Sequence, residues 1–437
     1  MHQRVLDIRT LFTALMLGMS AAEEGCYGTP RSTWRDAGGG GSGGLGGSNG
    51  GNPDDAGDAS SEADATGCPP ICPGPTTGPT TGFGACVNDE CRISCDAMYP
   101  TLCATSKACV DLTSDSDNCG ACGHDCLGGS CMGGQCQPVL IAQYFGHPMI
   151  IYVGAQAVYA TTDLGYVGRA NKDGSDLKPL AMPGFASSAF VETLLVEDGD
   201  RVFLVRIAPV LQLSYCLTSG CDATATPIGG PYTQYFAVDQ ANHKIVWVDY
   251  SPARFVSSPT VGTISGVDLP GGSLASGSNV ARLFYSHGGI YFASGGGESI
   301  SRIAVAGGLI ATVTGGTAPL AILGANSSSL FVYDGSAIGS VPLPSGDGRS
   351  PKPLIAAALN VNVDGHFAAD DESMYWASNG QASTCQISNC SGTQKALPKR
   401  AVDRMWDVGI DSAAVYLLAE SGDAANPAVS TVWKLAK

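Results

Sequence analysis

The sequence predicts an all-β protein whose C-terminal part, residues 138–437, is a seven-bladed β-propeller closed by its own first strand. Three observations predict this fold: a hydrophobic motif that occurs seven times at nearly constant spacing, a composition with 59 glycines and only 14% charged residues, and a strand-like segment that lies upstream of the first repeat and is missing from the last. Because glycine weakens helices and serves tight turns, the composition favours strands joined by turns.

The repeated motif is a β-branched or aliphatic residue followed by an aromatic residue and then small or apolar residues. Its seven copies begin at Val158, Val202, Val246, Ile290, Leu330, Met374 and Val415. Successive copies are 44, 44, 44, 40, 44 and 41 residues apart. A propeller of four-stranded blades produces such spacing, because each blade is one repeat of similar length. The alternative, a β-sandwich or an open array, does not explain both the period and the missing strand.

The other strands of each blade are placed around these motifs. An apolar segment that ends in a turn precedes the motif at 194–198, 236–239 and 366–370, and it suits the inner strand that lines the channel. A third and a fourth strand follow, as at 300–304 and 309–313. The aromatic residues recur at the repeat period, so they are predicted to be core.

The last blade is one strand short within its own repeat. Its sequence ends at the predicted third strand, 432–436, whereas 138–142 precedes the first blade and closely matches 353–356, a fourth strand of the fifth blade. Two unpaired strand edges would favour aggregation. We therefore predict that 138–142 completes the last blade.

Twelve of the 17 cysteines lie between Cys68 and Cys136, which defines a cysteine-rich module at 68–137. A reducing cytosol would leave them as thiols, whereas an oxidising compartment would join them. Few large apolar residues lie between them, so disulfides worth about 2–4 kcal/mol each replace a hydrophobic core. The connectivity stays open. The disulfide candidates in the densest part are Cys103, Cys109, Cys119, Cys122, Cys126, Cys131 and Cys136.

Two metal sites are alternatives in this module. Cys119 and Cys122 with Cys131 and Cys136 have a spacing that zinc can use, although an oxidising setting favours disulfides. The alternating polar residues of 111–117 resemble a calcium loop, but Ser116 replaces the glycine of that loop and the glutamate of its twelfth position is absent. A solvated loop is the preferred interpretation.

Two further cysteine pairs lie in the propeller, Cys216 with Cys221 and Cys385 with Cys390. Both lie between the third and fourth strands of their blades. Four intervening residues make a hairpin loop whose flanking positions are cross-strand neighbours, close enough for a disulfide. We predict one local disulfide in blade two and one in blade six.

The N-terminus predicts export. Residues 1–22 carry two arginines, a short apolar run and a small-residue cleavage site, which are the marks of a signal peptide. Residues 23–67 are rich in Gly, Ser and Asp and bury almost nothing, so they are predicted to be a disordered tether. The cysteine left over, Cys26, is a lipidation candidate, which would make the protein a lipid-anchored lipoprotein of the cell surface or outer membrane. Free secretion is the alternative.

Two segments resemble known families. Residues 118–123, the flanking 109–111 and the trailing 134–136 resemble the stigma-specific-type cysteine-rich repeat of plant secreted proteins and predicted myxobacterial surface proteins. The paired cysteines of the propeller, together with 374–379, look like the Tyr-Trp-Thr-Asn-type propeller repeats of predicted myxobacterial surface proteins. Both resemblances imply an extracellular role without naming a ligand.

Charge and chemistry narrow the function to two classes. A net charge of −16 repels nucleic acid and anionic membranes, so neither is an expected partner. No two of the six histidines have the spacing of a metal site, and no cofactor is expected. The first class is a monomeric surface binding or scaffolding protein with an envelope or extracellular protein or glycan as its partner. The second is an exported hydrolase or lactonase that holds a channel metal through Glu192, Asp239 and Asp370.

Overall fold

The computed structural model describes residues 83–437 except 88–89, 96, 107, 182–194, 207–211, 222–224, 231–232, 234, 251–252, 276–279, 295–296, 316–319, 335–336, 345–350, 357–366, 402 and 422–428. All described residues belong to one compact unit, Thr66–Lys437. The predicted signal peptide, the tether, Cys26 and Glu192 lie outside the described residues.

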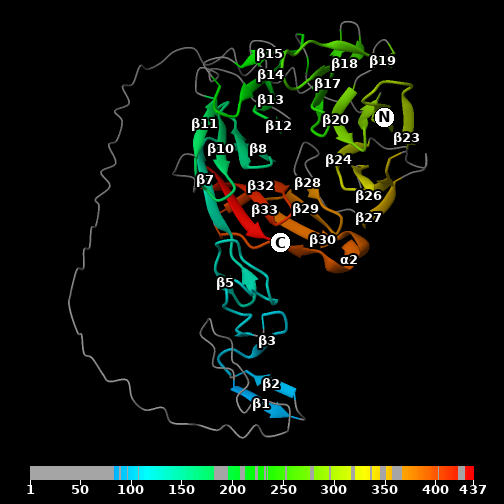
Figure 1. The fold of residues 1–437 in the computed structure, drawn as a ribbon. Coiled ribbons are helices and arrows are strands. Elements are labelled where there is room, and N and C mark those ends of the chain that lie inside the picture. Colours follow the sequence, from blue (N-terminus) through cyan, green and yellow to red (C-terminus); the bar gives the residue numbers. More distant parts are fainter. Residues whose placement is uncertain are drawn as a thin grey trace, which may run out of the picture. The chain divides into compact units, whose positions relative to one another are not determined.

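The structure is a seven-bladed β-propeller, which confirms the predicted fold class (Figure 1). Each blade is a four-stranded antiparallel sheet. Blade one consists of β8 (Pro148–Val153), β9 (Ala157–Thr162), β10 (Val167–Asn171) and β11 (Lys178–Ala181). Blade two consists of β12 (Leu195–Asp198), β13 (Arg201–Arg206), β14 (Gln212–Leu217) and β15 (Thr226–Pro227). Blade three consists of β16 (Phe236–Asp239), β17 (Lys244–Tyr250), β18 (Ala253–Pro259) and β19 (Val267–Ser273).

The remaining blades follow in chain order. Blade four consists of β20 (Val280–Ser286), β21 (Gly289–Ser294), β22 (Ser299–Ala304) and β23 (Ala311–Gly315). Blade five consists of β24 (Ala321–Ala325), β25 (Ser329–Tyr333), β26 (Ala337–Pro342) and β27 (Lys352–Ala356). Blade six consists of β28 (Phe367–Ala369), β29 (Ser373–Ser378), β30 (Gln381–Gln386) and β31 (Lys395–Ala396), with η2 (Ile387–Asn389) and α2 (Cys390–Thr393) before β31. Blade seven consists of β32 (Asp403–Ile410), β33 (Ala414–Ser421), β34 (Val429–Ala436) and β7 (Val139–Phe145).

The seven sequence motifs all lie in the second strand of a blade, and their residues are buried. Neighbouring blades cover both faces of this strand, so its residues do not alternate between core and solvent. All six residues of β9 are buried, as are the first six of β33. A continuous apolar run in these strands therefore reflects burial on two sides.

The first strands lie toward the middle of the ring (Figure 1). β8 contacts β12, and contacts run from β16 through β20, β24 and β28 to β32. β32 in turn contacts β8, which closes the ring. The inner strands predicted at 194–198, 236–239 and 366–370 are β12, β16 and β28.

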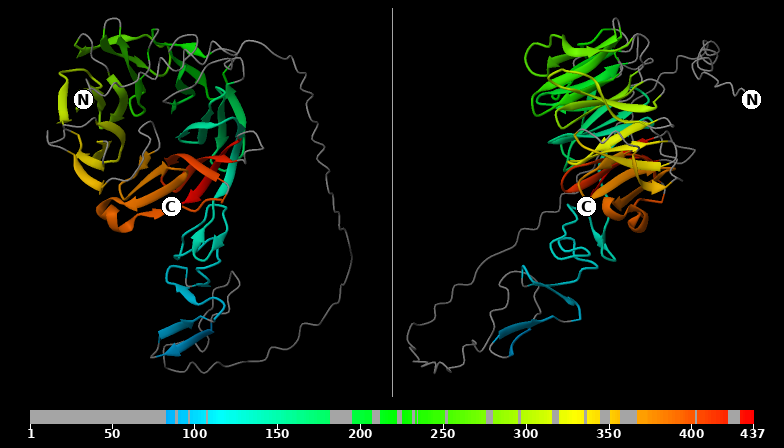
Figure 2. Two further views of the ribbon diagram at one scale, coloured as in Figure 1. Left: turned by 180° about the vertical axis from the view of Figure 1, so that it is seen from behind. Right: turned by 90° about the vertical axis from the view of Figure 1, so that its right-hand side faces the viewer.

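The closing strand is the one that the sequence predicted. β7 pairs antiparallel with β34 along its length, with Val429 opposite Phe145 and Lys434 opposite Val139. Figure 2 shows this strand beside the red C-terminal strands. Blade seven thus combines three strands from the C-terminal end of the propeller with one from its beginning.

One predicted strand is displaced. The fourth strand of blade four begins at Ala311, two residues after the predicted start at Leu309. Gly307 and Gly308 both have positive φ, and they extend the turn that follows β22. Leu309 is consequently 92% exposed in this turn.

The described part of the cysteine-rich module contains three two-stranded sheets, β1 (Phe83–Val87) with β2 (Glu90–Ser94), β3 (Thr101–Cys103) with β4 (Ala108–Val110), and β5 (Cys131–Met132) with β6 (Gln135–Cys136). Four disulfides connect it in the described residues: Cys95–Cys109, Cys103–Cys122, Cys119–Cys131 and Cys126–Cys136. Four of these cysteines pack with Trp433, Leu435 and Tyr375 of blades six and seven in one buried cluster.

The two propeller disulfides join Cys216 to Cys221 and Cys385 to Cys390, each with 4.9 Å between the Cα atoms. In blade two, a bridge between Leu217 and Gly220 makes the predicted hairpin. Blade six differs from the prediction, because η2 and α2 occupy the loop and Cys390 begins a helical turn instead of a strand. The described part of the chain contains no helix of the length and hydropathy that a membrane span requires.

Candidate functional site

A polar residue lies at the turn between the first and second strands of several blades. Asn326, Asp370 and Asp411 each stand four residues before the motif, and each side-chain oxygen accepts hydrogen bonds from two backbone N–H groups of its own turn. Such Asx turns satisfy donors that the sheet leaves unpaired. The acids at this position therefore build the turns.

These turns also join neighbouring blades. The second carboxylate oxygen of Asp370 accepts a hydrogen bond from Lys437 Nζ at 2.7 Å, and that of Asp411 accepts one from Lys172 Nζ at 2.8 Å. Asp198 also joins two blades. It is buried at the end of β12 and contacts His243 and the hydroxyl of Thr260 in blade three. Carboxylates thus connect blades two to three, six to seven and seven to one.

The electrostatic setting of two of these acids keeps them ionised. Burial opposes ionisation of Asp370, but hydrogen bonds from Lys437, Ser373 and Glu372 outweigh it and lower the pKa of this carboxyl. Burial likewise opposes ionisation of Asp411, and Lys172 together with the turn amides lowers its pKa to about 2.

The acids considered as channel metal ligands have structural roles where they are described. Asp239 is 1% exposed and accepts hydrogen bonds from the N–H and the side-chain amide of Asn242. Asp370 is bonded to Lys437 and to its own turn. Neither residue lies among the side chains that line the central channel, and Glu192 is outside the described residues.

The described histidines belong to turns and strand ends. His147 contacts Glu420, His243 contacts Asp198, and His287 contacts the hydroxyl of Ser286. His124 lies in the module, and its two ring nitrogens are each 2.6 Å from a carbonyl oxygen, Cys119 O and Lys437 O. His2 and His366 lie outside the described residues.

The cysteines of the module that could bind a metal ion form disulfides with other cysteines of the module. The sulfur atoms of Cys119, Cys126 and Cys136 lie within 4.8 Å of one another, but these cysteines are in disulfides to Cys131 and to each other. In the loop 111–117, Asp111 accepts hydrogen bonds from Thr113 and Ser114, as expected for a solvated loop that is held by its own turns.

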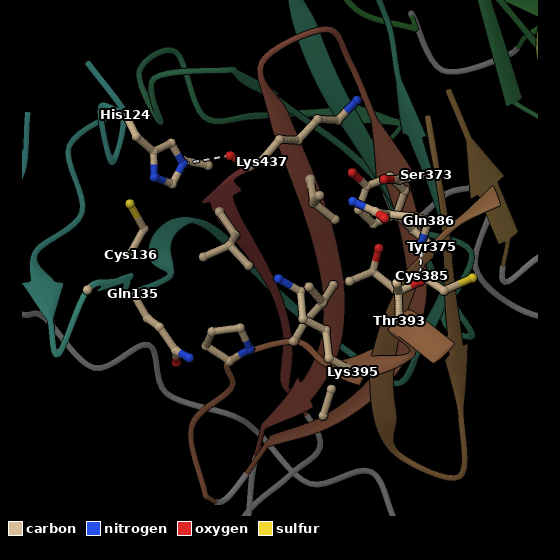
Figure 3. A pocket seen from close by; sticks show the side chains of 18 residues that line it. His124, Gln135, Cys136, Ser373, Tyr375, Cys385, Gln386, Thr393, Lys395 and Lys437 are labelled. Carbon is tan, nitrogen blue, oxygen red and sulfur yellow. Dashed lines mark hydrogen bonds between the residues drawn. The ribbon is translucent and has the colours of Figure 1, made fainter. Parts of the chain in front are cut away.

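A cavity of about 370 Å³ lies between the module and blades six and seven, and we call it the module cleft (Figure 3). The module lines it with His124, Gly134, Gln135 and Cys136. Blades six and seven line it with Ser373, Tyr375, Thr384, Cys385, Gln386, Thr393, Lys395, Ala396, Leu397, Pro398, Val415, Leu435, Ala436 and Lys437.

The module cleft is bounded by two short strands at sheet edges. Among the described strands, β31 is the outermost strand of blade six and pairs with β30 alone, while β6 pairs with β5 of the module alone. Lys395 of β31 is exposed beside the cleft. The sequence did not point to this cleft, because its walls come from segments some 250 residues apart.

A second cavity, of about 360 Å³, is the central channel. Its walls are the first strands of blades one, two, four, five, six and seven. Most of the lining is apolar, as in Ile150, Leu195, Phe284, Leu323 and Phe367. Arg282 of β20 is the charged residue among the described side chains that line it.

Fold and lining together define the class of this protein as a β-propeller with an apolar channel and a lateral cleft. No family model matches the chain, and no curated protein matches it. Among solved structures it is similar to one described as "AfRom2 CNH domain", at 9% identity over 68% of this chain and 99% of that one, with a TM-score of 0.45. It is also similar to "YCF48 bound to D1 peptide", at 10% identity over 69% of this chain and 96% of that one, with a TM-score of 0.49.

Proposed function

We propose that this chain is an exported binding protein that captures a protein partner as an extended segment in the module cleft. The observation that carries the proposal is the pair of strand edges, β6 and β31, that bound the cleft on its two sides. Unpaired strand edges bind extended peptides through backbone hydrogen bonds, and neighbouring side chains select the sequence.

The lining indicates the chemistry of that segment. Leu397, Pro398 and Leu435 offer apolar surface, while Lys395 adds an exposed positive charge at the strand edge. A peptide with alternating apolar and acidic residues would complement both. The strand edges therefore favour a protein partner over a glycan.

The structural role of the acidic residues in the turns favours a binding function over a catalytic one. Asp239 and Asp370, which an exported hydrolase would need at a channel metal, hold turns and join blades instead. Catalysis needs titratable groups that converge on one site, whereas recognition of a partner needs only a rigid surface such as the one these blades provide.

Site-specific cross-linking tests the proposal. A photoreactive amino acid at Gln386, an exposed residue of the module cleft, should give a discrete product with an envelope or secreted protein. The matched control is the same group at Leu309, which is 92% exposed in blade four. Lys395→Glu should weaken the product, whereas Lys244→Glu in blade three should not. Equal products at Gln386 and Leu309 would contradict the proposal.

Export and anchoring belong to the same proposal. The disulfides of the described residues indicate an oxidising compartment. We propose that residues 1–22 direct export and that Cys26 carries a lipid anchor at the cell surface. Cys26→Ser should then move the protein from the membrane fraction to the soluble fraction. Unchanged fractionation, or a mature N-terminus at Glu23, would indicate free secretion.

A further inference from the structure

A group of basic residues begins at the module cleft and continues beyond it, and we call it the basic ridge: Lys395, Lys399, Arg400 and Arg404. They fall within ten positions of a chain that has 23 lysines and arginines against 39 acidic residues. Lys395, Arg400 and Arg404 are exposed, and Lys399 is half-buried. On a protein with a net charge of −16, such a surface attracts anionic groups that the rest of the chain repels.

The ridge follows the edge of blade six. Lys395 of β31, labelled in Figure 3, lies opposite Thr384 of β30. Nζ of Lys399 donates to the carbonyl oxygen of Gly380, in the turn between β29 and β30, at 2.8 Å. The side chain of Arg404 packs against the same glycine, because a Cβ atom at Gly380 would lie 3.0 Å from Arg404 Cγ. The basic side chains therefore extend from the cleft to the start of blade seven.

No ion pair neutralises the ridge in the part of the chain that the structure describes. The ammonium group of Lys399 donates to two backbone carbonyl oxygens, those of Gly380 and Asp403. The guanidinium of Arg400 lies over the ring of Trp433, 5.5 Å from its centre. Carbonyl groups and aromatic rings attract a cation but carry no net charge, so the ridge keeps its positive charge.

The acidic residues next to the ridge contact other groups. Glu420 lies opposite Arg404 in the pairing of β32 with β33, and its carboxylate contacts Nδ1 of His147 at 2.8 Å. Asp403, the acid within the ridge sequence, is 2% exposed and accepts a hydrogen bond from Ser421 of blade seven. The exposed cations of the ridge are therefore available to a partner outside the chain.

We infer that the basic ridge binds a run of acidic residues in the protein segment that enters the module cleft. The inference rests on the function proposed above, because Lys395 belongs to both the cleft and the ridge. Clusters of basic residues recognise acidic motifs through charge-assisted hydrogen bonds. Trp433 is 6% exposed beneath Arg400, so its ring offers a sugar no open face for stacking. A protein segment therefore fits the ridge better than an acidic glycan.

Titration of the full, oxidised chain with a deca-glutamate peptide tests the charge complementarity. We expect binding that weakens as the salt concentration rises from about 50 mM to about 300 mM, because salt screens exposed charges. A Gly-Ser peptide of the same length should bind at least about tenfold more weakly. An oligogalacturonate of the same charge is the glycan probe. If it bound as tightly as deca-glutamate, the assignment to a protein segment would be overturned.

A double variant locates the site. Arg400→Gln combined with Arg404→Gln should weaken deca-glutamate binding by about tenfold or more. The matched control is Lys178→Gln combined with Arg254→Gln, which removes the same charge from residues that pair with acids. Circular dichroism and the thermal midpoint establish that both variants are folded. Full deca-glutamate affinity in the folded ridge variant would overturn the inference.

The cross-link at Gln386 separates this inference from the proposed function. Arg400 and Arg404 do not line the module cleft, so the ridge variant leaves the cleft itself unchanged. This variant should weaken the cross-linked product, because the partner loses the contacts of its acidic run. A product of unchanged strength would overturn the inference alone. Absence of the product from the chain with its natural ridge would contradict the proposed function, and the inference with it.

Discussion

Lys172 of blade one donates a hydrogen bond from Nζ to Oδ2 of Asp411 in blade seven, at 2.8 Å. The pair thus spans the junction where the first blade of the propeller meets the last. Tyr416 donates to the same oxygen at 3.0 Å, and Lys172 lies 6.0 Å from the centre of the Tyr416 ring. The junction is therefore held by this polar contact in addition to strand β7.

The first prediction concerns that pair. Lys172→Met and Asp411→Asn should each lower the free energy of unfolding, and a double-mutant cycle should give a coupling energy of about 1 kcal/mol, since both side chains are about three-quarters buried. Urea denaturation measures it. The pair Arg169 and Asp176 within blade one is the control, because it joins no blades. A coupling energy of zero for Lys172 and Asp411 would show that the contact does not stabilise the junction.

The second prediction concerns pH. The pKa of Asp411 is lowered from 3.8 to about 2 in the folded protein, so the stabilisation by its charged form is complete above about pH 4 and is lost as the pH falls toward 2. The stability difference between the natural protein and Asp411→Asn should therefore shrink over this range. Urea midpoints at pH 5 and pH 2.5 measure it. A difference that stays constant would contradict this assignment.

The third prediction concerns the closing strand. Tyr144 of β7 packs directly over Gly168 of β10, where even a Cβ atom would collide with the tyrosine ring. Gly168→Val should force β7 away from blade one and cost about 1–3 kcal/mol of stability. Gly315→Val is the matched control, because a Cβ atom at Gly315 meets nothing nearer than 3.8 Å. Equal thermal midpoints for the two variants would argue against tight packing of the closing strand.

Removal of the whole strand extends this test. Deletion of residues 138–145 leaves the outer edge of β34 unpaired, so it should lower the unfolding midpoint and promote aggregation. A deletion variant that unfolds at the same midpoint as the intact chain would show that β7 does not close the propeller.

The fourth prediction concerns the two local disulfides. Non-reducing peptide mapping should link Cys216 to Cys221 and Cys385 to Cys390. Because each closes a loop of only a few residues, replacing either pair by serine should cost about 2 kcal/mol. If peptide mapping found free thiols at these four positions in exported protein, the prediction would be wrong and the argument for an oxidising compartment would be weaker.

The sequence by itself determined the architecture. Copies of one motif from Val158 to Val415 recur because every blade buries its second strand between two neighbours, and this demand is local and periodic. The missing strand of the last blade was visible in the same way, as was the cysteine density of the module. The exact start of β23 could not be predicted from the sequence, because the turn that contains Gly307 and Gly308 determines it.

Only the tertiary structure decided which side chains meet. Asp370 is a candidate metal ligand by residue type, yet its partner is Lys437, 67 residues away. Arg282 carries no local sign that it faces the channel, because a bulge in β20 and the carbonyl of Ile322 orient it. The module cleft has no sequence signal, since its walls at Gln135 and Lys395 come together only when the module packs on blades six and seven. Periodicity records what each strand must bury, whereas a site depends on contacts between distant segments that no local pattern contains.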